Sequence, residues 1–199
     1  MSGPIHWSWQ IRRLAVYFAF VLAAVLAAGA FGALHDQISY TVSPEYFTKF
    51  KFVQFDLLND AVPERVRAAQ VGFLGAWWMG VPLGLLIGAA GFIHPDMPQM
   101  RRALLWSLVV AIAFTLLFAL GGLVYGLIQT AAFGLAHHEG WYIPQGLVQP
   151  RRFISVGYMH NAAYTGGEIA VPVAWVFHLL WLRRQRQTAG VPSSALRSG

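Results

Sequence analysis

Four polar side chains interrupt an apolar stretch near the C-terminal end of the chain. The segment GYMHNAAYTGGEIAVP, residues 157–172, carries His160, Asn161, Tyr164 and Glu168. His160, Tyr164 and Glu168 recur every four residues, so a helix would carry them along one face over roughly 12 Å. A carboxylate inside a bilayer is costly unless it is protonated, paired or bound to a cation. The pattern therefore predicts a polar site on this helix that faces the protein interior.

Further ligand-type side chains lie where the first and third apolar runs end. They are His35, Asp36, His137, His138 and Glu139. Neutral imidazoles together with a carboxylate are the ligands that zinc, copper and iron use in proteins. We predict a transition-metal site (Zn, Cu or Fe) formed by His160 and Glu168, with His35 or His137 completing it.

Other interpretations of the same residues remain open. Asn161, Tyr164 and Glu168 could instead line a pocket for a small organic ligand. They could also join neighbouring helices by hydrogen bonds, each worth about 0.6 kcal/mol. His35 could cap a helix end, and His137 could lie in an exposed loop. No fixed ligand spacing such as H-E-x-x-H selects among these interpretations.

The chain contains no cysteine, which restricts its chemistry. Disulfides, thiolate metal sites and thiol redox reactions are excluded. Any catalysis would have to use histidine, carboxylate or tyrosine side chains. The residue types leave open whether the protein is an enzyme, and they identify no catalytic residue.

The elements that must position these side chains are membrane-spanning helices. Of the 199 residues 57% are hydrophobic and only 11% are charged, too few polar residues to cover a soluble domain. Apolar runs long enough to cross a hydrocarbon core of about 30 Å occur four times. Their predicted bounds are about 14–34, 68–93, 103–135 and 153–182. The predicted fold class is an all-α integral membrane protein, a four-transmembrane-helix bundle with a single domain over residues 1–188 and a disordered cytoplasmic tail over 189–199.

The long connection between the first two spans is rich in aromatic residues and is predicted to be ordered. Its segment FTKFKFVQF, residues 47–55, alternates aromatic and polar residues in part, which fits either a short strand or a segment at the membrane interface. We expect this loop to cover the predicted pocket on the outer side.

Two prolines predict irregular backbone inside the spans. Pro82 cannot donate to the carbonyl of Trp78, and Pro172 cannot donate to that of Glu168, because proline has no N–H group. Freed carbonyls at membrane depth are tolerated where a cavity or a partner satisfies them. A cavity between the second and fourth spans is therefore expected.

Basic residues are mildly more numerous on the side of the chain that carries both termini. The positive-inside rule then predicts that both termini are cytoplasmic and that the protein lies in the cell inner (plasma) membrane. The net charge of +6 is explained by this topology and by anionic lipid, so no nucleic-acid partner is expected. An alternative interpretation of the first apolar run is a cleaved signal peptide, which its length disfavours.

The predicted function is that of a polytopic inner-membrane protein with an intramembrane polar pocket on its outer side. The pocket would bind a metal ion or a small ligand, in an accessory or transport role. One alternative is a structural or assembly subunit of a membrane complex, and another is a membrane enzyme that uses a His/Glu pair. The expected partners are the lipid bilayer and either other membrane subunits or further copies of this chain.

Overall fold

The part of the chain that the structure describes is built from helices. The structure is a computed structural model that describes residues 5–189, and it contains no strand within them. The elements in chain order are α1 (Ile5–Val42), α2 (Pro44–Tyr46), η1 (Phe47–Lys51), α3 (Phe52–Gln54), α4 (Glu64–Ala76), η2 (Trp77–Met79), α5 (Gly80–Ala90), η3 (Gly91–Ile93), α6 (Met97–Phe133), η4 (Ala136–His138) and α7 (Pro150–Ala189). The predicted tail therefore lies, apart from Ala189, outside the described residues.

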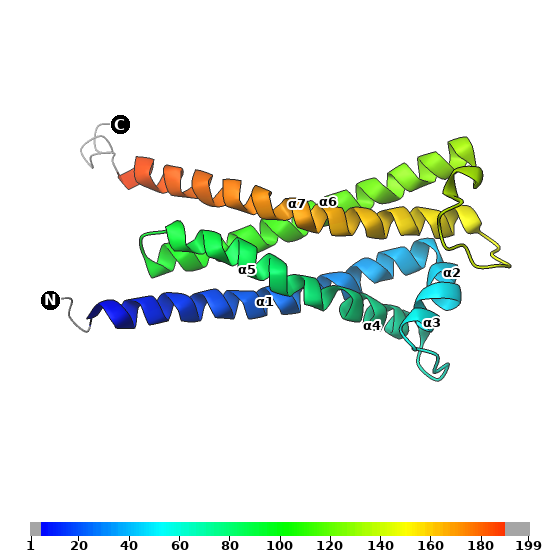
Figure 1. Cartoon of the computed structure of the whole chain (residues 1–199), viewed down its shortest axis with the longest axis horizontal. Helices are drawn as coiled ribbons and strands as arrows, with labels where there is room; N and C mark the ends of the chain where they lie inside the picture. Colours follow the sequence, from blue (N-terminus) through cyan, green and yellow to red (C-terminus); the bar gives the residue numbers. More distant parts are fainter. Residues whose placement is uncertain (1–4, 190–199) are drawn as a thin grey trace, which may run out of the picture.

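Four helical rods are long and apolar enough to cross a membrane, which confirms the predicted all-helical fold with four such helices. The rods are Ser8–Val42, Glu64–Ile93, Met97–Phe133 and Pro150–Gln187. They run alternately in opposite directions, so that α1 begins and α7 ends at the same end of the molecule (Figure 1). We call this the terminal end, and we call the opposite end, formed by residues 43–63 and 134–149, the loop end.

The four rods pack as two hairpins. Helix α1 packs mainly on α4 and α5, and α6 packs mainly on α7, with fewer contacts between the two pairs. The backbones of α1 and α4 come close at Gly32 and Gly72, because a Cβ atom on either glycine would collide with the carbonyl oxygen of the other. Small residues allow such close approach between helices that gain no hydrophobic energy from leaving lipid.

The second rod is not one regular helix. It changes to a 3₁₀ turn at η2, Trp77–Met79, and returns to α-helix at Gly80. The break includes Trp78, to whose carbonyl Pro82 cannot donate, as the sequence predicts; this carbonyl accepts instead from a backbone N–H at the end of η2. Helix α7, in contrast, continues through Pro172.

The connection between α1 and α4 folds into three short helical pieces at the loop end (Figure 1). Phe47 and Phe52 are buried there and pack with Phe153 and Ile154 of α7. The strand interpretation of residues 47–55 is therefore wrong. The three-residue spacing from Phe47 to Phe50 and from Phe52 to Phe55 places aromatic rings on one side of a helical turn, which an alternating strand would not do.

Candidate metal centre

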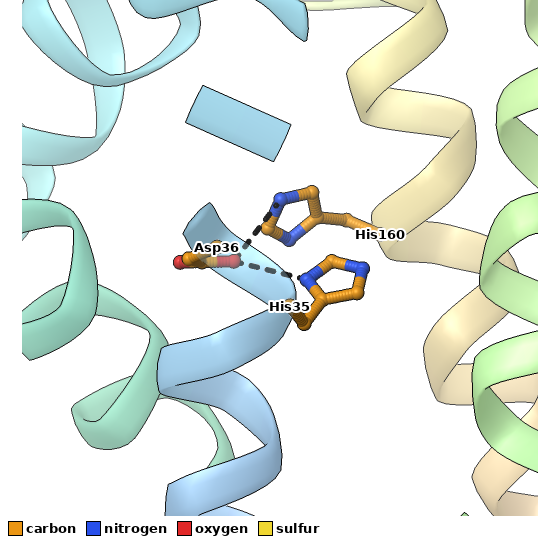
Figure 2. A group of neighbouring side chains, drawn as sticks. All are labelled: His35, Asp36 and His160. Atoms are coloured by element: carbon orange, nitrogen blue, oxygen red, sulfur yellow. Dashed lines mark hydrogen bonds and ion pairs between the residues drawn. The ribbon is translucent and has the colours of Figure 1, made fainter. Parts of the chain in front are cut away.

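Three ligand-type side chains meet at the loop end of the bundle. His35 and Asp36 come from α1, and His160 comes from α7 (Figure 2). His35 Nδ1 lies 3.0 Å from Asp36 Oδ1, and His160 Nε2 lies 3.5 Å from the same oxygen. One candidate ligand atom from each residue lies within 4.8 Å of those of the other two. The cluster thus joins the two hairpins through a shared carboxylate.

The position of the cluster follows from the length of α1. The helix does not end with its apolar run but continues to Val42, so His35 and Asp36 lie inside it rather than at its cap. Ser39, one turn further on, donates its hydroxyl to the carbonyl oxygen of His35 at 2.9 Å. The exposed fractions of His35 and Asp36 are 4% and 2%. These two residues are therefore part of the packed interior.

The cluster contains buried polar atoms that lack hydrogen-bond partners among the described residues. They are His35 Nε2, Asp36 Oδ2 and His160 Nε2. Leaving a buried donor or acceptor without a partner costs about 1–3 kcal/mol, so native proteins rarely tolerate several together. Three such atoms in one cluster could pair with a polar group, and the cluster could hold a cation.

Aromatic rings enclose the cluster on the side of the loop end. Tyr46 of α2 stacks on His160, with ring centroids 5.0 Å apart and planes 30° from parallel. The rings of His35 and His160 meet edge to face at 4.7 Å. Burial, and next the negative charge of Asp36, raise the pKa of the Tyr46 phenol, which therefore stays neutral at physiological pH.

The cluster lies at a cavity, and among the described residues Lys51 is the one lysine that lines this cavity. Lys51 donates to Gln54 Oε1 at 2.9 Å and lies 4.5 Å from the centre of the Phe50 ring. Burial lowers the pKa of Lys51, and the charge of Asp36 opposes that shift. The charges of Lys51 and Asp36 therefore partly balance each other.

The structure brings only part of the predicted site together. His160 and His35 are in the cluster, and Tyr164 lines the adjoining cavity. Asn161 and Glu168 are exposed on α7, and Glu168 makes no hydrogen bond or ion pair with any described residue. The reason is helical geometry, since each step of four residues turns the side chain by about 40° and eight residues turn it by about 80°.

His137 also lies away from the cluster. It is exposed and stacks on Phe133, with ring centroids 5.0 Å apart. Its neighbour His138 is buried instead, and its Nε2 lies 3.2 Å from the hydroxyl of Tyr158 on α7. The carboxylate of the cluster is thus Asp36, which the sequence pattern places beside His35 but does not assign as a ligand.

A second histidine pair lies at the terminal end. His94 Nε2 and His178 Nδ1 are 2.9 Å apart, and both residues are fully buried. Arg13 covers this pair by donating to the carbonyl oxygens of Phe92 and His94, at 2.7 and 2.9 Å. The two rings hydrogen-bond directly to each other, which fits a structural link between α7 and the turn after the second rod.

Comparison with known proteins gives no further assignment. No protein-family model, no curated protein and no solved structure matches this chain.

Proposed function

We propose that this protein is a multi-span protein of the inner membrane, with both termini cytoplasmic, that binds a divalent transition metal in an accessory or transport role. The metal site consists of His35, Asp36 and His160 at the outer side. The observation that carries the proposal is the convergence of three ligand-type side chains from two hairpins, two of them buried and His160 mostly buried, with candidate ligand atoms within 4.8 Å of one another.

The spacing of the ligand atoms supports this proposal. Zinc bound by nitrogen and oxygen at about 2.0–2.2 Å in tetrahedral geometry keeps its ligand atoms about 3.3 Å apart. The two distances to Asp36 Oδ1, 3.0 Å from His35 and 3.5 Å from His160, lie on either side of that value, and the two imidazole nitrogens lie within 4.8 Å of each other. Three protein ligands would leave a fourth position for water or for a transported or accessory ligand, as in open zinc sites.

The choice among metals follows from the donors. Two imidazoles and one carboxylate suit zinc, copper and iron(II), whereas calcium and magnesium prefer oxygen ligands alone. The membrane-enzyme alternative with a His160–Glu168 pair receives no support, because Glu168 is exposed and makes no contact with the cluster.

The experiment that tests the proposal compares two carboxylate-to-amide substitutions. Wild type, Asp36→Asn and Glu168→Gln are purified in detergent, equilibrated with zinc sulfate and freed of excess metal, and bound zinc is measured by mass spectrometry. We expect about one zinc per chain in wild type and in Glu168→Gln, and at least tenfold weaker binding in Asp36→Asn. His160→Gln, which keeps a polar side chain of similar size, is expected to match Asp36→Asn.

Two results would contradict the proposal. One is folded wild type that retains no zinc, copper or iron after equilibration with each. The other is unchanged metal affinity in both Asp36→Asn and His160→Gln, which would place the metal elsewhere. Helix content and elution as a single species show in each case that the variant is folded.

A further inference from the structure

A long cavity extends from the metal cluster into the bundle between the two hairpins. Along α1 its wall runs from Phe20 to Asp36, sixteen residues or about 24 Å at 1.5 Å per residue. The opposite wall comes from α6 and α7, including Ala163 and Ala170. The cavity is therefore elongated along the helices, and its length approaches the thickness of a hydrocarbon layer.

The lining of the cavity is polar at one end only. The polar side chains among the described residues that line it are His35, Asp36, Lys51, Thr115, His160 and Tyr164. The Thr115 hydroxyl is already used, because it donates to the carbonyl oxygen of Ala111 at 2.8 Å. The other five lie at the end of the cavity nearest the loop end, and apolar residues, many of them alanine and glycine, line the remaining length. The cavity thus consists of a long apolar part, the shaft, and one polar end.

The polar end of the cavity favours particular chemical groups. It offers Asp36 Oδ2 as a hydrogen-bond acceptor and two imidazole Nε2 atoms; none of them has a hydrogen-bond partner among the described residues, and His160 Nε2 lies 3.5 Å from Asp36 Oδ1. Its opposite charges, Asp36 and Lys51, partly balance each other. An anionic headgroup would therefore face the carboxylate without net attraction, whereas hydroxyl and carbonyl groups can pair with the carboxylate and the imidazoles.

We propose that this cavity binds a neutral lipid with one apolar chain and a head that carries hydroxyl or carbonyl oxygens, the class to which isoprenoid quinones belong. The chain lies in the apolar shaft, where it makes dispersion contacts with the lining that an empty shaft would lack. A hydroxyl group of the head can donate to Asp36, and a carbonyl oxygen of the head can accept from an imidazole N–H group. The inference depends on the cavity and not on the proposed metal, so either can fail while the other holds.

Two glycine substitutions separate this proposal from nonspecific detergent or lipid contact. Gly167 lines the cavity, and a Cβ atom there would meet only Leu83 Cδ1 across it, at 3.7 Å. Gly121 lies on the exposed side of α6, where a Cβ atom would meet nothing within 4 Å. Gly167→Leu therefore fills the shaft, and Gly121→Leu makes the same chemical change outside it.

The probe is decylubiquinone, a quinone with a ten-carbon chain, titrated against the purified full chain in detergent with binding followed by the rise in melting temperature. We expect saturable binding to wild type and Gly121→Leu, and at least tenfold weaker binding to Gly167→Leu. His160→Phe is expected to weaken binding as well, because the carbonyl oxygens of the quinone can accept a hydrogen bond from an imidazole N–H group. Decanoate, a carboxylate with a chain of similar length, is expected to raise the melting temperature of no form.

Three outcomes would overturn the proposal. They are no saturable binding of decylubiquinone to folded wild type, equal affinity in wild type and Gly167→Leu, and binding of decanoate as tight as that of the quinone. Gly75→Leu provides a second way to fill the cavity if Gly167→Leu does not fold, because a Cβ atom at Gly75 meets only Phe55 at 3.6 Å. Zinc content measured on the same samples distinguishes failure of the lipid site from failure of the metal site.

Discussion

At the scale of single residues, the chemistry of the loop end depends on which carboxylate reaches the interior. Asp36 is 2% exposed and shared between two histidines, whereas Glu168 is exposed. Both are single acidic residues within or beside apolar runs, so their types and local surroundings do not distinguish them. Their position in the bundle does, because Asp36 faces His160 on the other hairpin, whereas Glu168 faces away from the bundle.

The histidine pair at the terminal end predicts a loss of stability in acid. Burial, followed by the nearby Arg13, lowers the pKa of His94 below its ordinary value of 6.5, and Asp96 opposes this change. A histidine whose pKa is lower in the folded protein contributes its full stabilisation only above its unfolded pKa. Stability should therefore fall as the pH drops from about 6.5 through the folded pKa of His94, by at most about 1.4 kcal/mol for each pH unit in that interval.

Thermal unfolding in detergent between pH 7.5 and pH 5 measures this effect. We expect the melting temperature of wild type to fall over that range and that of His94→Asn to change less. His137→Asn, which removes an exposed histidine, should keep the wild-type slope. An unchanged slope in His94→Asn would show that another group carries the acid sensitivity.

At the scale of elements, hydrogen bonds attach α2, which carries Tyr46, to the start of α7. Glu45 in α2 accepts hydrogen bonds from the backbone N–H groups of Val148 and Gln149, both at 2.8 Å. These residues immediately precede α7, where free N–H groups and the helix dipole favour a carboxylate. These bonds keep α2 next to the start of α7 and so help to hold the adjacent Tyr46 against His160.

Glu45→Gln is expected to loosen this attachment. The hydrogen bonds from Val148 and Gln149 lower the pKa of Glu45, so its stabilising effect is present above the ordinary value of 4.5 and is lost as the pH falls below it. At neutral pH we expect a loss of about 1 kcal/mol, comparable to removal of a helix cap. Faster amide hydrogen exchange at Val148 and Gln149 is the direct measurement.

The matched control is Glu139→Gln, which changes an exposed glutamate in the same region that forms no hydrogen bond or ion pair with any described residue. It should leave exchange at Val148 and Gln149 unchanged. Equal exchange in wild type and Glu45→Gln would mean that aromatic packing of residues 44–54, rather than the carboxylate, holds α2 in place.

At the scale of the whole molecule, the arrangement of the rods separates two chemically different ends. The terminal end carries the His94–His178 pair. The candidate metal cluster and the polar end of the cavity lie toward the loop end. An even number of rods that run in alternate directions places the start of α1 and the end of α7 together (Figure 1). The proposed orientation then assigns the loop end to the outer side.

Thiol labelling of intact cells tests this orientation, because the chain has no cysteine of its own. We expect a membrane-impermeant maleimide to label Gly140→Cys at the loop end directly, and to label Pro95→Cys at the terminal end only after the membrane is permeabilised. Wild type provides the unlabelled control. The opposite labelling pattern would reverse the proposed orientation and move the metal site to the cytoplasmic side.

The sequence by itself determines the properties that depend on neighbours along the chain. Four apolar runs of sufficient length specify four helices, because every backbone polar group in lipid must be satisfied within its own helix. The lack of a donor from residue 82 to the carbonyl of Trp78 likewise follows from the sequence, since the missing N–H group is a covalent property of proline; the 3₁₀ turn there does not, because α7 continues through Pro172. The approximate positions of these features depend on no knowledge of packing.

Only the tertiary structure decides which polar side chains meet. His160 and Asp36 lie 124 positions apart in the chain, and their contact depends on the depth and rotation of α1 relative to α7. The drift of about 40° for every four residues lets His160 face inward while Glu168 on the same apparent stripe faces outward. Spacing along one helix therefore identified the histidine, and the packing of two hairpins selected the carboxylate that joins it.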